Sequence, residues 1–350
     1  MKNILILNLL FFLSSLMITP LWAESSGAFL RHGLGAKAMG LGKAYQTVVK
    51  DPGALYWNPA GLANINGQAK ISDSLENEEN EDPFGDTKTN QLLNSEGQKE
   101  ESPKETQPEL PSVERPFEMQ FYNAVSQLTF DRQAGFSALA FTAVGGTIGF
   151  GLLGFYTNDI EGYNEIGEST GSITYQTMAA YLGYAFESGA TRAGFSLTGI
   201  NEKIADKSLN GASLNVGIQL MPLPILEFGA NIQNLAGVIQ EHAGSDAKYE
   251  RLDTILSASI GIRTLPPKSS LLVLLGFEAN LDTLESEDLN ANFGLAYSIN
   301  RYSYVMAGLN TNGLSCGFGM SLSFFQIAYA INQDRLKTGI QHHFDINFLF

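Results

Sequence analysis

Four basic side chains lie in a short stretch near the start of the chain and are candidates to bind an acid. They are Arg31, His32, Lys37 and Lys43. A carboxylate held in an interior of low dielectric constant is stabilised by a charged donor beside it. A lysine that faces water is the commoner alternative. Arg31 and Lys37 are therefore candidate ligand contacts on chemistry alone.

Residues typical of catalysis or metal binding do not form a recognisable pattern. The histidines are His32, His242, His342 and His343, and Cys316 is the single cysteine. The last two histidines are neighbours, and neighbours on a strand point to opposite faces, so they cannot share a metal ion. A serine and a histidine from distant segments could still pair, and the sequence leaves that open. We expect no enzyme, no metal and no cofactor.

Two segments carry apolar side chains on both faces, which suggests contact with an apolar ligand. In residues 150–155 and 270–277, large apolar side chains occur at both odd and even positions, so both faces of a strand would carry them. Packing against an interior segment of the same chain explains the pattern equally well. The candidate ligand contacts are Leu153, Phe155, Leu271, Val273 and Phe277.

The elements that must position these residues are strands, because the chain alternates with a period of two from Phe117 onward. In residues 212–220 one face is wholly apolar and the other carries Ser, Asn, Gly and Gln. Residues 289–298 repeat the pattern. Segments of about ten residues with an apolar outer face are typical of membrane-spanning barrel strands. The apolar residues Phe344, Ile346, Phe348 and Phe350 at the end resemble a closing barrel strand.

Counting back from Phe350 predicts fourteen strands, an even number as bacterial barrels prefer. The predicted strands are 117–130, 134–144, 147–157, 173–186, 192–202, 211–220, 225–232, 254–263, 270–280, 289–298, 303–309, 313–322, 324–331 and 338–350. Long and short connections mostly alternate, as expected when one end faces the periplasm. A barrel of this width is not filled by its own side chains, so another segment must occupy the lumen.

The first residues are typical of a secretory signal peptide. Lys2 precedes an apolar run, and Ala23 is a small residue at the expected cleavage site. An uncleaved anchor is the alternative, although the run is short for a membrane span. We assign residues 1–23 to the signal peptide, 24–65 to a plug or hatch, 66–116 to an acidic insert and 117–350 to the barrel.

The chain is acidic, and much of its charge lies in one segment. The formal net charge is −15, and residues 73–115 hold thirteen acidic and four basic side chains. A chain without a basic stripe is a poor binder of nucleic acid. The acidic segment has few apolar residues and several prolines, so we expect it to be disordered. We place it in the periplasm or at the barrel mouth; if residues 68–72 form a strand, it lies outside instead.

Residues 33–63 carry a glycine-rich pattern followed by Leu-Tyr-Trp-Asn-Pro-Ala-Gly-Leu. Glycine permits positive φ and close backbone approach, and Asn before Pro favours a turn. The motif residues are Gly33, Gly35, Gly40, Gly42, Asp51, Asn58, Pro59, Ala60 and Gly61. The pattern resembles the N-terminal signature of FadL-type outer-membrane transporters and of the PorV/PorQ proteins, and its spelling is closer to the latter.

The resemblance implies an all-β fold, a transmembrane barrel of about fourteen antiparallel strands with an N-terminal hatch in the lumen. In FadL-type proteins the hatch moves to pass fatty acids or hydrocarbons, which implies transport and a hydrophobic ligand. In PorV-type proteins the barrel serves a protein secretion system instead. Either implies the outer membrane of a Gram-negative-type bacterium, contact with its lipids, and recognition of Phe350 by the barrel assembly machinery. The acidic insert departs from the family pattern.

Overall fold

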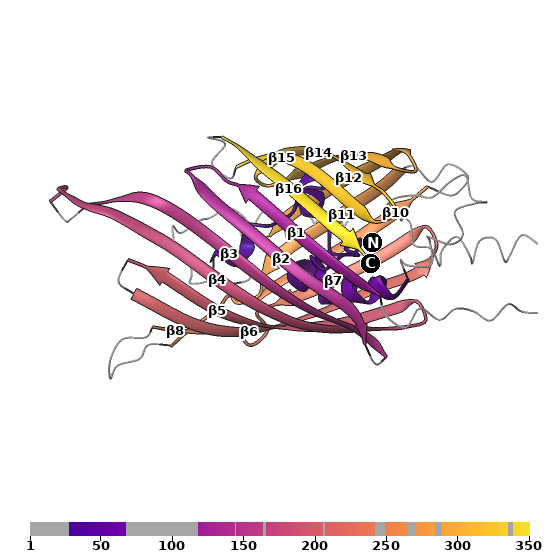
Figure 1. Cartoon of the computed structure of the whole chain (residues 1–350), viewed down its shortest axis with the longest axis horizontal. Coiled ribbons are helices and arrows are strands. Elements are labelled where there is room, and N and C mark those ends of the chain that lie inside the picture. The colour runs from indigo at the N-terminus through magenta and orange to yellow at the C-terminus, as the bar shows by residue number, and fades with distance from the viewer. Residues whose placement is uncertain are drawn as a thin grey trace, which may run out of the picture.

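The strands of this protein close into a single antiparallel barrel, seen from the side in Figure 1. The structure is a computed structural model, and it describes residues 28–67, 118–143, 145–163, 166–205, 207–241, 249–264, 271–283, 289–334 and 339–350. The predicted signal peptide and nearly all of the predicted acidic insert lie outside the described residues, as do the first residues of the predicted hatch.

Four short helices precede the strands in the described residues: η1 (Ala28–Arg31), α2 (Ala36–Gly40), α3 (Ala54–Trp57) and η2 (Pro59–Gly67). The strands are β1 (Met119–Gln127), β2 (Arg132–Ala143), β3 (Gly146–Tyr163), β4 (Ser169–Ser188), β5 (Thr191–Ile204), β6 (Lys207–Leu223), β7 (Leu226–Gln233), β8 (Val238–Glu241), β9 (Tyr249–Arg251), β10 (Ile255–Arg263), β11 (Leu271–Asn280), β12 (Asn290–Asn300), β13 (Ser303–Asn310), β14 (Gly313–Ser321), β15 (Phe325–Gln333) and β16 (Ile340–Leu349).

The wall of the barrel contains fourteen strands, as predicted. Strands β1–β7 and β10–β16 each pair with the next strand along the wall, and β16 closes the ring by pairing with β1. Strands β8 and β9 form a small hairpin that pairs with the start of β6 outside this ring. Closure matters because a barrel leaves no strand edge with unpaired backbone groups in lipid.

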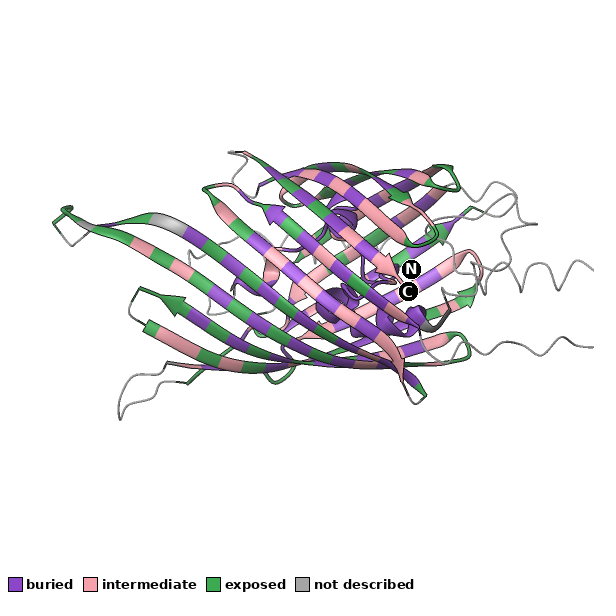
Figure 2. Ribbon diagram, viewed as in Figure 1, coloured by how far each residue is buried: buried purple, intermediate pink, exposed green. Residues whose placement is uncertain are grey.

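Burial alternates along the strands, as the striped ribbons of Figure 2 show. On β6, Val216, Ile218 and Leu220 are exposed on the outer face, whereas Asn215 and Gln219 are buried in the lumen. On β16, the apolar residues face outward, and the inward side chains are His343, Asp345 and Asn347. The period of two in the sequence therefore corresponds to apolar side chains on the outer face and polar side chains on the inner face. This is the pattern of a membrane barrel.

The two ends of the barrel differ. We call the end with Met119 and Phe350 the terminal end, and the opposite end the far end. Connections at the terminal end are mostly short, with Gly189–Ala190 between β4 and β5 as one example. Short turns are typical of the periplasmic side. Phenylalanines cluster on the outer wall at this end, where Phe121 and Phe348 stack with ring centroids 6.4 Å apart; aromatic belts mark a membrane boundary.

Two predicted loops at the far end are mostly strand instead. Residues 157–172 belong largely to β3 and β4, and residues 202–210 to β5 and β6. Figure 1 shows the resulting extension of β3 and β4 beyond the other strands. The ladder continues through Ile160 opposite Ile173, with register shifts on either side. The sequence concealed these strands because a sheet outside the membrane does not need an apolar face.

None of the helices in the described parts of the chain is long and apolar enough to cross a membrane.

Replacing Leu197 by Arg tests the orientation of the wall. Leu197 lies on the outer face of β5, about half exposed and far from both strand ends. We expect Leu197→Arg to lower the free energy of unfolding of the barrel in phospholipid vesicles by about 2–4 kcal/mol, because the charge must enter hydrocarbon. The measurement is reversible unfolding of the refolded barrel in urea. The control is Asn201→Arg, on the same face nearer the far end, for which we expect a much smaller loss; equal losses would contradict a lipid-facing wall.

Candidate functional site

The N-terminal segment lies inside the barrel and fills its lumen. Nearly all residues from Phe29 to Ile65 are buried, and they contact strands around most of the ring. Figure 1 shows the short helices of this segment within the wall. We call residues 28–67 the plug. It contains little regular structure, so its buried backbone groups need partners from elsewhere.

A belt of glycines on the inner wall makes room for the plug. Nine neighbouring strands, β3–β7 and β10–β13, each place a glycine against it. The belt consists of Gly149, Gly183, Gly194, Gly217, Gly229, Gly261, Gly276, Gly294 and Gly308. Gly149 is paired with Gly183, Gly194 with Gly217, and Gly294 with Gly308 across the ladders.

The fit at the belt is close enough to involve backbone atoms. A Cβ atom at Gly229 would lie 2.5 Å from Thr47 Cα, and one at Gly294 would lie 2.7 Å from the carbonyl oxygen of Leu41. Contacts this short are not tolerated between carbon atoms, so these positions accept only glycine while the plug is seated. The belt therefore defines the outline of the plug, strand by strand.

Inward amide and hydroxyl side chains complete the hydrogen bonding of the plug backbone. Asn231 Nδ2 donates to the Trp57 carbonyl at 3.0 Å, and Gln219 Nε2 donates to the Gln46 carbonyl at 3.0 Å. In the other direction, the Thr47 amide donates to Ser259 Oγ at 3.1 Å. The polar lumen predicted from the alternation thus serves as a set of partners for irregular buried backbone.

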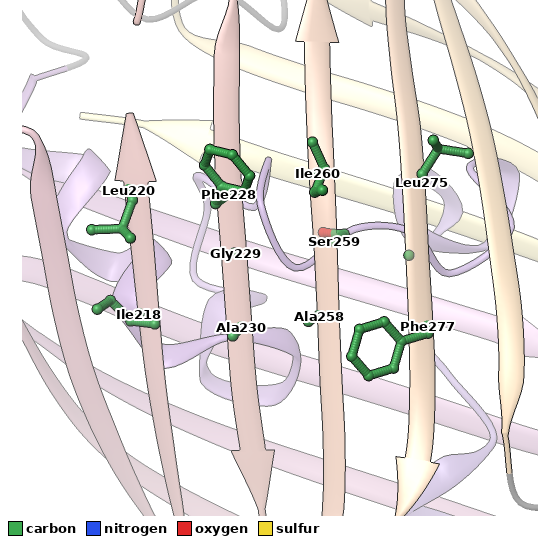
Figure 3. A pocket seen from close by; sticks show the side chains of 11 residues that line it. Ile218, Leu220, Phe228, Gly229, Ala230, Ala258, Ser259, Ile260, Leu275 and Phe277 are labelled. Atoms are coloured by element: carbon green, nitrogen blue, oxygen red, sulfur yellow. The ribbon is translucent and has the colours of Figure 1, made fainter. Parts of the chain in front are cut away.

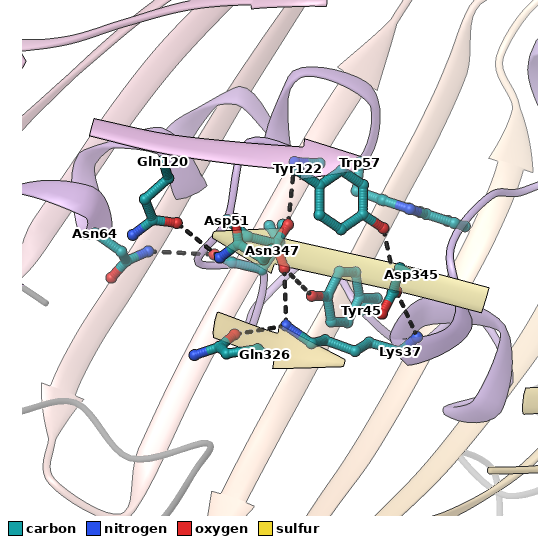
Figure 4. Close-up of polar contacts among 12 residues, drawn as sticks. Lys37, Tyr45, Asp51, Trp57, Asn64, Gln120, Tyr122, Gln326, Asp345 and Asn347 are labelled. Carbon is teal, nitrogen blue, oxygen red and sulfur yellow. Dashed lines mark hydrogen bonds and ion pairs between the residues drawn. The ribbon is translucent and has the colours of Figure 1, made fainter. Parts of the chain in front are cut away.

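On the side of the barrel where the belt is absent, a polar cluster joins the plug to β1, β15 and β16 (Figure 4). Lys37 Nζ lies 3.1 Å from Asp51 Oδ2 and donates to Gln326 Oε1 at 2.9 Å. The Lys37 amide and the Tyr122 hydroxyl both donate to Asp345 Oδ2, at 3.2 and 3.1 Å. We call Lys37, Asp51, Tyr122, Gln326 and Asp345 the latch.

The latch is a charged group removed from water. Burial lowers the pKa of Lys37, but attraction by Asp51, Tyr304 and Asp345 outweighs burial, and the pKa stands above the ordinary lysine value. Lys37 therefore remains an ammonium ion at neutral pH. A buried ion pair contributes little when complete, but loss of one partner leaves an uncompensated charge.

The predicted motif residues form the turns of the plug. The backbone φ angles of Gly33, Gly35 and Gly42 are +85°, +84° and +61°, in the region that favours glycine. Gly40 packs against Met306, and a Cβ at Gly61 would lie 2.6 Å from the Val49 carbonyl oxygen.

The two predicted turns are built by their own side chains. The Gly53 amide donates to Asp51 Oδ1 at 3.0 Å, and the Ala60 amide donates to Asn58 Oδ1 at 3.2 Å across Pro59. Asn58 Nδ2 also donates to the Gln46 carbonyl at 2.8 Å, which ties two parts of the plug together. The conformational prediction for this motif is confirmed, and direct ligand contact by it stays a prediction.

The basic candidates already have partners within the protein. Arg31 lies 3.7 Å from Asp253 near the far end, and Lys37 is held in the latch. Lys43 donates to the Arg31 carbonyl at 2.9 Å, and the His32 ring stacks on Phe155 with centroids 5.2 Å apart. Arg31 is the more exposed of the two predicted contacts, at 32% of its side chain against 11% for Lys37.

Of the apolar candidates, only two face the lumen. Leu153 and Phe155 are buried inside the barrel, as predicted. The prediction that Leu271, Val273 and Phe277 face the lumen is wrong, because β11 turns these side chains outward, and Phe277 is 40% exposed. Leu272 and Leu274 point inward instead, and Leu274 packs near the belt. Both faces of β11 are apolar, so alternation alone did not distinguish them.

Sequence reasoning missed the barrel side of the site. It did not identify the belt or the latch residues Tyr122, Gln326 and Asp345. One signal was available, since Asp345 is the only acid in the predicted closing strand, residues 338–350. The belt glycines also lie at inward positions of the predicted alternation, but their common contact with the plug requires the closed ring.

The structure also assembles a serine, a histidine and an asparagine that are distant in sequence. His343 Nδ1 lies 2.7 Å from Ser126 Oγ, and its Nε2 lies 2.6 Å from Asn332 Oδ1. Ser126 and His343 are fully buried, so a substrate cannot reach the hydroxyl, and the group serves as a bridge between β1, β15 and β16. Within the described residues, no group of three or more His, Cys, Asp or Glu side chains is placed to hold a metal ion.

A closed fourteen-stranded barrel with an apolar outer face and a filled lumen defines an outer-membrane-type barrel. Hydrocarbon transporters are among the solved structures that it resembles. The chain resembles the Pseudomonas putida toluene transporter TodX at 12% identity and a TM-score of 0.50, over 91% of this chain and 96% of that one. The Ralstonia pickettii toluene transporter TbuX matches at 11% identity, a TM-score of 0.50, and coverage of 92% and 98%.

The CymD monoaromatic hydrocarbon channel matches at 9% identity and a TM-score of 0.53, over 91% of this chain and 98% of that one. No protein-family model matches the sequence, and no curated protein sequence matches it either. At these identities the likeness is one of fold. The PorV/PorQ branch to which the motif spelling points stays a prediction.

Filling the belt should displace the plug. We expect Gly229→Leu to destabilise the protein by about 1–3 kcal/mol or more, because the side chain must enter space held by plug backbone. Trp57 reports on the plug directly, since the only other tryptophan is Trp22 in the predicted signal peptide. We expect its fluorescence to shift to longer wavelength. The control is Gly154→Leu on β3, where a Cβ meets nothing within 4 Å; a similar shift there would contradict the belt.

Removing the latch ammonium should loosen the plug from β15, where Lys37 Nζ donates to Gln326. We expect Lys37→Met to lower the free energy of unfolding by about 3–5 kcal/mol, because Asp51 is left buried without its cation. Urea unfolding followed by Trp57 fluorescence measures this loss. Lys37→Met combined with Asp51→Asn removes both charges and should recover part of it. If the double variant loses as much as the sum of the two single variants, the pair is not coupled.

Proposed function

We propose that this protein is an outer-membrane channel that passes hydrophobic small molecules, and that the plug is the hatch that gates it. The observation that carries the proposal is a membrane barrel whose lumen is occupied by a separate segment rather than by wall side chains. A segment that fills the lumen without being part of the wall can move relative to it, and a movable plug provides a gate. The fold shared with toluene transporters supports the same substrate class.

The inner wall that packs against the plug toward the far end is apolar. Leu153, Phe155, Phe136 and Tyr181 contribute to one buried apolar cluster with the plug. Arg31 lies at its edge, 32% exposed at the side chain. We infer that neutral hydrocarbons, or fatty acids paired with Arg31, enter from the far end and pass when the latch and belt contacts are released. No catalytic step is part of this proposal.

The same proposal places the protein in the outer membrane of a Gram-negative-type bacterium, with the terminal end in the periplasm. Its outer wall contacts the membrane lipids, and the exposed terminal Phe350 is the residue we expect the barrel assembly machinery to recognise.

A role in protein secretion is the second candidate, favoured by one observation. At the far end, large apolar side chains are exposed, among them Ile166 between β3 and β4 at 77% and Tyr249 on β9 at 73%. Such residues outside the membrane suit a protein partner. Co-purification with secreted proteins that is abolished by Ile166→Ser and Tyr249→Ser would favour this role over transport.

A reversible lock on the plug tests the gate. A Cβ at Gly276 lies 3.5 Å from Ala44 Cα, so the two Cα atoms lie no more than about 5 Å apart, given a bond of about 1.5 Å. That separation fits a disulfide. We expect Ala44→Cys with Gly276→Cys, in a Cys316→Ala background, to block uptake of labelled toluene and oleate by cells when oxidised and to restore it when reduced.

The outcomes of this experiment separate the two parts of the proposal. The single-cysteine variants under the same oxidant are the controls. Uptake that is unaffected by the lock contradicts gating by the plug but leaves transport standing. Uptake no faster than in cells lacking the protein, in either redox state, contradicts transport itself.

A further inference from the structure

The outer wall contains a recess that the transport proposal does not use. It spans four neighbouring strands, β6, β7, β10 and β11, and has a volume of about 430 Å³ (Figure 3). Its side chains belong to the outward face, with Ile218 and Phe277 each about 40% exposed. We propose that this recess is a binding site for the end of one acyl chain of a membrane lipid.

The shape of the recess follows from the register of the four strands. Ile218, Ala230, Ala258 and Phe277 are cross-strand neighbours and form one row across the wall. The two alanines in the middle leave a depression, and the large side chains at the ends close it on two sides.

A neighbouring row closes a third side. Toward the terminal end, Phe228 and Ile260 stand between Leu220 and Leu275, as Figure 3 shows. Toward the far end, the next row, which contains Ile232, does not line the recess. The result is a walled hollow in a surface that is otherwise covered by large side chains, which is the form expected of a site that holds one flexible apolar group.

The floor of the recess is backbone. Gly229 and Gly276 face the lumen and have no side chain, and the Ser259 hydroxyl also points inward, where it accepts the Thr47 amide. Everything that faces the recess is therefore apolar apart from hydrogen-bonded backbone. The strands beneath it are continuously paired, so the recess is not an opening into the lumen and differs from the site described above.

The depth of the recess in the membrane determines which part of a lipid can reach it. Ile218 lies six residues from Pro224 in the turn at the terminal end. At about 3.3 Å per residue and a tilt of about 40°, the row stands about 15 Å above that end, near the middle of an apolar band about 25 Å tall. Chain ends, not headgroups, are the lipid parts present there.

The size of the recess agrees with a chain end. A methylene is about the size of a water molecule, about 30 Å³, so the volume holds roughly a dozen methylene groups. The chain is in hydrocarbon whether bound or free, so van der Waals contact with the lining side chains provides the attraction. An empty hollow would lose those contacts, whereas a flexible chain adapts to it.

Photolabelling with a phospholipid tests this site. The protein is reconstituted in phosphatidylethanolamine vesicles that contain a lipid with a diazirine near the end of one acyl chain, and labelled residues are mapped by mass spectrometry. We expect labelling to concentrate on β7 and β10 beside Ala230 and Ala258, several-fold above the opposite wall at Val125 on β1 and Phe344 on β16. Ala258→Phe, which fills the hollow, should remove the excess.

The matched control is Ala180→Phe, an exposed outward alanine on β4 away from the recess. It should leave the labelling unchanged, and heat-modifiable migration should show that both variants fold. Uniform labelling around the barrel overturns the proposal. Labelling that excess toluene or oleate displaces at concentrations that leave the bilayer intact assigns the recess to the transported compound instead. Cross-links between copies assign it to a second copy.

Discussion

The absence of side chains at one level of the inner wall is the constraint on which the rest of the structure depends. Nine neighbouring strands place glycine where the plug approaches. Each glycine leaves space at only one position, but on nine neighbouring strands these spaces join into one continuous surface that accepts the plug. A plug of irregular backbone can then lie against the wall at van der Waals distance, as close-packed interiors require. The inner wall and the plug are therefore complementary in shape, and each packs well only against the other.

Close packing alone would leave the plug backbone without hydrogen bonds, and the polar inner face supplies them. Asn231, Gln219 and Ser259 bond directly to plug backbone. The latch differs in kind, because it holds a buried ion pair between the plug residues Lys37 and Asp51 beside β16. Packing contacts are broken gradually, whereas a buried charge is either paired or not. Displacement of the plug would separate Asp345 on β16 from the Lys37 amide.

The sequence predicted the barrel well and the site only in part. The alternation of apolar and polar residues, together with the alternation of long and short connections, was sufficient to predict fourteen strands. Lipid requires an apolar face on every spanning segment. The motif also placed its turns correctly, since the side chains of Asp51 and Asn58 act on amides two residues away. Prediction failed on β11, where both faces are apolar and Leu271, Val273 and Phe277 turned out to face lipid. It also failed at the far end, where the strands extend beyond the membrane and no longer alternate between apolar and polar residues.

The sequence by itself determined what each segment is: an alternating wall, a glycine-rich plug and the turns within it. Those features follow from local rules that act over two to four residues. Only the tertiary structure decided what the plug touches, because the belt, the latch and the recess each combine residues from distant strands. Asp345 meets Lys37 across 308 positions of the chain. That meeting depends on closure of the ring, and ring closure is a long-range property that no local pattern encodes.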